Sequence, residues 1–148
     1  MIFSYVGYEV EDAHAGAGTS VIYRPIVPVS FTGDGATVRF RGLLDTGADE
    51  TVLSYEMAEA IGATLIPGAH NRIVSAGGDV PLSYAQVAVE LEHDGERYRW
   101  NATVGVAEQA WEESLLGFRG FLEYFDVLFR GEQLEVVINR NGRELLAT

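Results

Sequence analysis

Cysteine and lysine are both absent from the 148-residue sequence. Without cysteine, the chain has no disulfide, no thiol nucleophile and no cysteine-based metal site. All 10 basic residues are arginines, and they form no run that would neutralise successive phosphates. Because 22 acidic residues leave a formal net charge of -12, we expect no nucleic-acid partner and interpret the acidity as a source of solubility.

Long apolar segments are also missing. No stretch approaches the roughly 20 uninterrupted apolar residues of a membrane span, and Met1–Val10 lacks the basic residues that begin a secretory signal. We therefore expect a soluble, cytoplasmic protein with no membrane partner. The length predicts a single domain over residues 1–148, and a hydrophobic content of 47% is enough to fill its core without disulfides or zinc.

Polar clusters that contain glycine separate β-branched and aromatic runs roughly every ten residues, which is typical of an all-β domain. Three hairpins are predicted. Their strand pairs are Val21–Phe31 with Thr37–Leu44, Ala85–Leu91 with Tyr98–Val106, and Gln133–Ile138 with Arg143–Leu146.

Two short segments have the pattern of helices instead. Ser54 is expected to cap a helix over Tyr55–Ile61 that ends at Gly62. The segment Phe118–Phe125 predicts one or two further turns. The alanine- and glycine-rich residues 11–20 are expected to form a mobile loop.

The segment with the clearest chemical content is Arg41–Ser54, where an apolar strand leads into Asp45, Thr46 and Gly47. The end of a strand holds the carboxylate in place, the threonine hydroxyl can hydrogen-bond, and the glycine lets a neighbouring chain approach closely. A carboxylate aimed from a rigid backbone suits general acid–base catalysis. An Asp-Thr-Gly triplet by itself, however, also occurs in ordinary turns.

The match to a known family is longer than this triplet. The eleven residues Leu43–Leu53 closely resemble the active-site segment of the retroviral-type aspartic proteases, the retropepsins. Leu115–Val127 is similar to the late hydrophobic-hydrophobic-glycine motif of that family, and Ile73–Val80 resembles its flap hairpin, although paired glycines also form ordinary hairpin turns. The similarities span most of residues 21–138, and they are nearer to bacterial retropepsin-like proteins than to the shorter viral enzymes. The resemblance implies a single-lobe acid-protease barrel and an aspartic endopeptidase activity that needs no cofactor or metal.

The resemblance also implies a role for each matched residue. The implied catalytic residues are Asp45, Thr46 and Gly47; the implied substrate-binding residues are Ala48, Asp49, Glu50, Ala76, Gly77 and Gly78; and the implied structural supports are Leu116, Gly117 and Arg119. One position departs from the family pattern, which often has an arginine directly after the late glycine, paired with the acid two residues past the catalytic glycine. Phe118 stands there in this chain. Either a shift of one residue lets Arg119 reach Asp49, or that ion pair is absent.

A single Asp-Thr-Gly implies a dimer. Peptide hydrolysis of this type needs two carboxyl groups roughly 3 Å apart, which share one proton so that one acts as the base and the other as the acid. We therefore expect a homodimer with its two-fold axis near Asp45, a peptide or protein substrate bound as an extended strand, and a working pH of roughly 4 to 6. The terminal segments Met1–Val10 and Glu135–Leu146 are expected to pair as strands across this axis.

Alternatives to catalysis remain open at this point. The same fold can serve as a catalytically silent, dimeric peptide-binding module. A hard-cation site at Asp45, Asp49 and Glu50 ranks lower, because their spacing does not match a calcium loop. Asp34 and Asp94 precede glycines in polar clusters and are expected to be turn residues, not a second catalytic aspartate.

Overall fold

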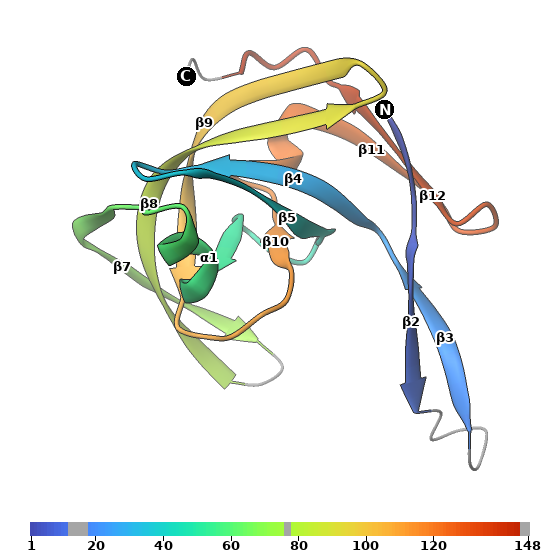
Figure 1. The fold of residues 1–148 in the computed structure, drawn as a ribbon, viewed down its shortest axis with the longest axis horizontal. Coiled ribbons are helices and arrows are strands. Elements are labelled where there is room, and N and C mark those ends of the chain that lie inside the picture. Colours follow the sequence, from blue (N-terminus) through green and yellow to red (C-terminus); the bar gives the residue numbers. More distant parts are fainter. Residues whose placement is uncertain (12–17, 76–77, 146–148) are drawn as a thin grey trace.

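A computed structural model of the chain describes residues 1–11, 18–75 and 78–145. Seven strands form a strongly curved sheet in the order β4-β5-β10-β6-β9-β8-β7, and a further pairing of β4 with β8 closes it into a barrel (Figure 1). Their bounds are β4 (Ile26–Thr32), β5 (Thr37–Leu44), β6 (Val52–Ser54), β7 (Leu65–Ser75), β8 (Gly78–His93), β9 (Glu96–Ala107) and β10 (Ser114–Leu116). The predicted all-β class is therefore confirmed.

One apolar core fills the barrel. Alternate residues of β4, Val27, Val29 and Phe31, point inward and are fully buried, as the two-residue period of a strand requires. Trp100 of β9 lies at the centre, and its ring packs edge-on against Phe121 with 5.6 Å between the ring centroids. Each such side chain stabilises the fold by about 1.5–3 kcal/mol through removal of apolar surface from water.

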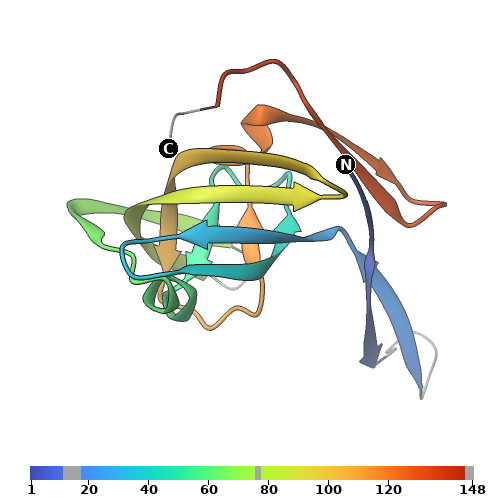
Figure 2. The same cartoon turned by 45° about the horizontal axis from the view of Figure 1, so that its top comes forward.

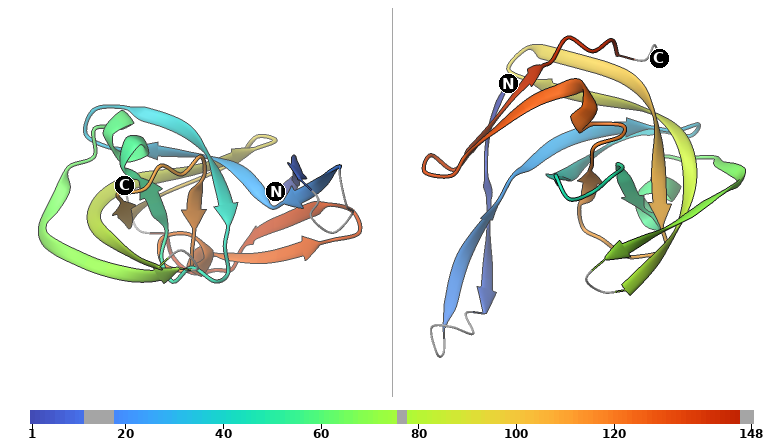
Figure 3. Two further views of the ribbon diagram at one scale, coloured as in Figure 1. Left: turned by 90° about the horizontal axis from the view of Figure 1, so that it is seen from below. Right: turned by 180° about the vertical axis from the view of Figure 1, so that it is seen from behind.

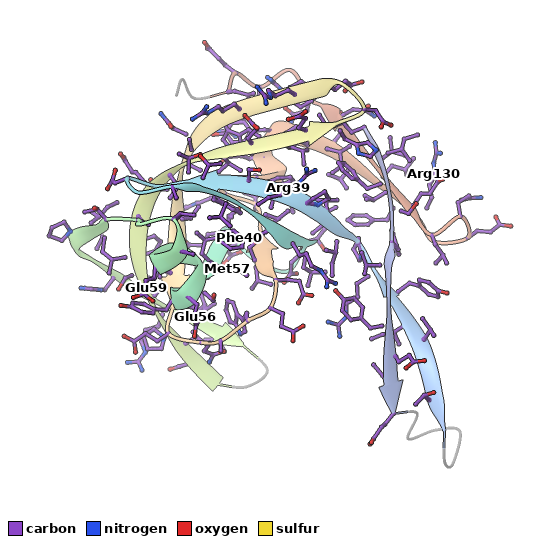
Figure 4. All side chains as sticks on the ribbon, viewed as in Figure 1. Arg39, Phe40, Glu56, Met57, Glu59 and Arg130 are labelled. Atoms are coloured by element: carbon purple, nitrogen blue, oxygen red, sulfur yellow. The ribbon has the colours of Figure 1, made fainter. Side chains whose placement is uncertain are left out.

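The predicted first helix is present as α1 (Tyr55–Ala60). The Ser54 hydroxyl accepts a hydrogen bond from the Met57 backbone N–H at 3.3 Å, and this satisfies a donor that would otherwise be unpaired at the helix start. Met57 faces the barrel, whereas Glu56 and Glu59 point away from it (Figure 4). The expected turns over Phe118–Phe125 reduce to one short 3-10 turn, η1 (Leu122–Tyr124).

Two smaller sheets flank the barrel. One has the order β1-β12-β11, and the other consists of β2 and β3 alone. Their bounds are β1 (Ile2–Ser4), β2 (Val6–Glu11), β3 (Thr19–Arg24), β11 (Phe125–Arg130) and β12 (Glu135–Arg140). The β2–β3 and β11–β12 hairpins both project from the same side of the barrel (Figure 2; Figure 3).

The prediction of one strand over Val21–Phe31 is wrong. Pro25 separates β3 from β4, which belong to different sheets, because proline has no N–H to donate to a ladder. The loop expected over residues 11–20 is also shorter at both ends, since Glu11 pairs with Thr19 in the β2–β3 hairpin. Residues 12–17 lie outside the described residues.

The C-terminal hairpin differs from the prediction as well. β12 pairs with β11 before it, and residues 143–145 form no strand. β12 also pairs with β1 of the same chain, with Ile2 opposite Val137, and β1 and β11 form the two edges of this sheet. Burial explains the choice of strand partners, because this pairing places Phe3, Val136 and Ile138 in the core.

Within the described ranges, no helix is long and apolar enough to cross a membrane.

Candidate active site

The Asp45 carboxylate is positioned by the turn that follows β5. The Asp45 N–H donates to the Leu116 carbonyl of β10 at 3.2 Å, and the Asp45 carbonyl accepts from the Ala48 N–H at 3.2 Å. The Gly47 N–H donates to Asp45 Oδ1 at 2.9 Å. Two main-chain hydrogen bonds hold the turn, and the third, from the Gly47 N–H, orients the carboxylate at the end of the strand.

Gly117 lets the segment after β10 pass directly behind this turn. A Cβ atom at Gly117 would lie 2.3 Å from the Glu50 carbonyl oxygen and 2.8 Å from the Ala48 carbonyl oxygen. The close approach allows the Phe118 N–H to donate to the Ala48 carbonyl at 2.9 Å. Leu116 and Gly117, two of the three supports expected from the sequence, are thus both in contact with the Asp45 turn.

Arg119 contacts the same turn through its backbone. Its N–H donates to the Asp49 carbonyl at 3.0 Å, and its carbonyl accepts from the Thr51 N–H at 2.9 Å. Among the described residues, no ion pair joins the Arg119 guanidinium to the Asp49 carboxylate. Of the two outcomes that the sequence left open, the structure shows the one without an ion pair between Arg119 and Asp49. Main-chain hydrogen bonds connect the two segments instead.

Glu50 has a partner that the sequence did not indicate. The Tyr84 hydroxyl of β8 donates to Glu50 Oε1 at 2.9 Å. Burial raises the pKa of Tyr84 above its ordinary value, the hydrogen bond from Asn71 lowers it, and the Glu50 carboxylate raises it further. Tyr84 and Glu50 also line a second cavity of about 390 Å³, to which Arg119 and Glu123 contribute. Tyr84 lies 34 positions from Glu50, so no local pattern could reveal the pair.

Asp45 opens into a cleft of about 630 Å³. One wall is the Asp45 turn and the strands beside it, and the opposite wall is β7; the lining residues are Asp45, Gly47, Ala48, Asp49, Glu50, Val52, Asn71, Arg72, Ile73, Val74 and Leu115. The apolar side chain of Val74, which lines the cleft, is 86% exposed to solvent. A groove lined by a strand on one side and by a carboxylate on the other suits an extended peptide.

The remaining predicted site residues lie at the edges of this cleft. Thr46 is exposed, and its hydroxyl has no hydrogen-bond partner within the described part of the chain. Gly78 begins β8 with a φ of 109°, a conformation that favours glycine. Ala76 and Gly77 lie outside the described residues. No group of three or more acidic or histidine side chains among the described residues is placed to hold a metal ion.

Comparison with known proteins agrees with this geometry. The sequence model of the family described as aspartyl protease matches residues 27–119. A retropepsin-like aspartic protease from Rickettsia conorii has 18% identity and a TM-score of 0.51, over 89% of this chain and 98% of that one.

Two further solved structures are more distant in shape. EIAV protease, solved with the inhibitor HBY-793, has 24% identity and a TM-score of 0.48, over 64% of this chain and 81% of that one. The retroviral protease-like domain of Ddi1 from Leishmania major has 14% identity and a TM-score of 0.46, over 82% and 93%. A comparison with curated protein sequences finds no match. The Rickettsia structure shows that the barrel has the retropepsin fold.

Proposed function

Since the chain belongs to the aspartyl protease family, we propose that it is an aspartic endopeptidase whose active site forms between two copies of the chain. The observation that carries the proposal is the Asp45 turn. Its carboxylate accepts a hydrogen bond from the Gly47 N–H and lines a cleft of about 630 Å³. Each chain supplies one such carboxylate, and the chemistry requires two. In this proposal, residues 1–148 act as one domain.

The proposed reaction uses the two Asp45 carboxyl groups in different protonation states. The ionised carboxylate takes a proton from a water molecule, whose oxygen attacks the scissile carbonyl carbon, while the protonated carboxyl group hydrogen-bonds to the carbonyl oxygen. The tetrahedral intermediate then collapses. The C–N bond breaks, the nitrogen receives a proton from the dyad, and the products are a carboxylic acid and an amine.

Several residues of the cleft have proposed roles in this reaction. Thr46, which is exposed in one chain, hydrogen-bonds to its counterpart across the two-fold axis, and Gly47 permits the close approach of the two turns. Ala48, Asp49 and Glu50 line the substrate subsites.

The β7–β8 hairpin is the proposed flap. Asn71–Val74 already form one wall of the cleft, and we assign Ala76, Gly77 and Gly78 to the part that closes over the substrate. An extended peptide between this wall and the Asp45 turn forms main-chain hydrogen bonds to both, as an added strand does.

The test is Asp45→Asn, which keeps the shape of the side chain and removes its charge. We expect the kcat for a casein or peptide-library substrate to fall about 10²–10⁴-fold, while sedimentation shows an unchanged dimer. Asp34→Asn is the matched control, because Asp34 is exposed in a turn and its variant is expected to cleave at the wild-type rate. Wild-type cleavage by Asp45→Asn refutes the proposal. Binding of a statine-type peptide by a wild-type protein that cleaves nothing supports the silent peptide-binding module instead.

A further inference from the structure

The β2–β3 hairpin lies outside the part of the chain that matches the aspartyl protease family. It ends at Arg24, whereas the match to the aspartyl protease family begins at residue 27. We call this hairpin the arm. Its two strands pair only with each other, and it extends away from the barrel (Figure 1; Figure 3). A two-stranded hairpin in water has marginal stability unless another surface covers it.

Apolar side chains occupy both faces of the arm. On the outward face, Val21 and Tyr23 are 49% and 50% exposed and lie on either side of Gly7. A Cβ atom at Gly7 would be 3.1 Å from Val21 Cγ1 and 3.2 Å from Tyr23 Cε1, so the glycine makes room for these two side chains to lie against the opposite strand. On the other face, Tyr8 and Ile22 are half-buried opposite each other. Glu9 and Glu11 of β2 are exposed on the same outward face, so the apolar patch of Val21 and Tyr23 is confined to the part of the arm around Gly7.

The base of the arm is fastened to the strands that carry the Asp45 turn. The Tyr8 hydroxyl donates to Glu113 Oε1 at 2.7 Å, and Arg41 of β5 hydrogen-bonds to the same hydroxyl and lies 3.4 Å from Glu113. The guanidinium of Arg41 also stacks over the Tyr8 ring, 5.1 Å from its centroid. Glu113 directly precedes β10, so these contacts fix the direction of the arm relative to β5 and β10.

A second connection lies next to the carboxylate itself. The Leu44 N–H, one residue before Asp45, donates to the carbonyl of Pro25, the residue that follows the arm. The distance is 3.0 Å. The arm therefore begins beside the residue that precedes Asp45.

From these contacts we infer that the arm packs on a second copy of this chain and holds the active dimer together. The inference rests on the proposed function, in which the site is incomplete without that copy. Two chains that each carry a net charge of -12 repel each other. Association then requires burial of apolar surface, and Val21 and Tyr23 supply it twice in a two-fold assembly, with Glu9 and Glu11 at the edge of the patch.

The first experiment measures dimer dissociation by sedimentation equilibrium over a range of concentrations. The double variant Val21→Ser, Tyr23→Ser is expected to raise the dissociation constant at least tenfold. At concentrations that restore the dimer, kcat is expected to equal that of the wild type. The matched control is Tyr55→Ser on α1, because Tyr55 is a tyrosine of nearly the same exposure, 51%, that lies away from the arm. Its dissociation constant is expected to stay within twofold of the wild-type value.

A second experiment does not depend on how the double variant folds. Because the chain has no cysteine, Tyr23→Cys creates a single labelling site for an environment-sensitive fluorophore. Its emission is expected to shift to shorter wavelength over the same concentrations at which the dimer forms, whereas a label at Tyr55→Cys is expected not to shift.

The outcomes separate the two proposals. A wild-type chain that dimerises and cleaves through Asp45, but whose dissociation constant is unchanged in the double variant, overturns the arm inference alone. If the dissociation constant of the double variant is unchanged and its KM is raised, the arm contacts the substrate and not a second copy, which also overturns the arm inference. A wild-type chain that stays monomeric and inactive at all concentrations overturns both the arm inference and the proposed function.

Discussion

Gly117→Ala is the substitution whose effect follows most directly from the geometry of the site. The added Cβ atom would lie 2.3 Å from the Glu50 carbonyl oxygen, although ordinary van der Waals contacts begin at 3.4 Å. Both groups belong to the backbone, so no side chain can rotate away. The segment after β10 and the Asp45 turn must therefore separate by about 1 Å.

This separation has a cost in stability and in activity. It stretches the hydrogen bonds from Phe118 to Ala48 and from Arg119 to Asp49, now 2.9 and 3.0 Å, beyond useful length. With about 1 kcal/mol for each lost hydrogen bond and the strain of overpacking, we expect the free energy of unfolding to fall by about 2–4 kcal/mol. Displacement of the Asp45 turn by about 1 Å is expected to lower kcat about 10²-fold in the protein that remains folded.

Urea unfolding followed by circular dichroism measures the first effect, and peptide cleavage well below the unfolding transition measures the second. Gly131→Ala is the control, because a Cβ atom at Gly131 meets nothing within 4 Å. The control is expected to change the free energy of unfolding by less than about 0.5 kcal/mol. If Gly117→Ala and Gly131→Ala have the same free energy of unfolding, the two segments do not pack as closely behind the Asp45 turn as described here.

Two further predictions concern aromatic residues. Trp100→Phe removes the hydrogen bond that the indole N–H donates to the buried Gly120 carbonyl at 2.8 Å and leaves a small cavity, so urea unfolding is expected to show a loss of about 2–4 kcal/mol. The control is Trp111→Phe, because the Trp111 indole N–H donates to the nearby, exposed Gln109 side chain. Its free energy of unfolding is expected to fall much less, and equal falls in the two variants would contradict this account. The raised pKa of Tyr84 means that the folded chain holds the phenolic proton more tightly than the unfolded chain, so stability is expected to fall as the pH rises above about 10. Tyr84→Phe is expected to flatten that alkaline decline in urea unfolding at several pH values, and an unchanged slope would count against the assignment.

Features carried by consecutive residues could be predicted from the sequence. The Ser54 cap and the stop at Gly62 were predicted correctly, because capping depends on groups within one turn of the helix. The Asp45 turn could be proposed as the candidate site because the resemblance that indicates it is carried by the consecutive residues Leu43–Leu53.

Strand partners at the ends of the chain could not be predicted in the same way. Alternation in Gln133–Ile138 correctly indicated a strand, but it did not say which neighbour the strand joins. The choice of β11 and β1 depends on which pairing buries Val136 and Ile138, and these partners come from opposite ends of the chain. Pro25 is present in the sequence, but the sequence does not show that it separates two sheets. That separation depends on β3 pairing with β2 while β4 joins the barrel sheet.

The sequence by itself determined the all-β class and the position of a carboxylate at the end of an apolar strand, because these depend on residue types and on contacts between near neighbours. Only the tertiary structure decided that Tyr84 holds Glu50, that the Arg119 backbone supports the Asp45 turn, and that the arm stands beside it. The physical reason is that each of these contacts joins segments far apart in the chain. Such segments meet only after the barrel has closed around its core.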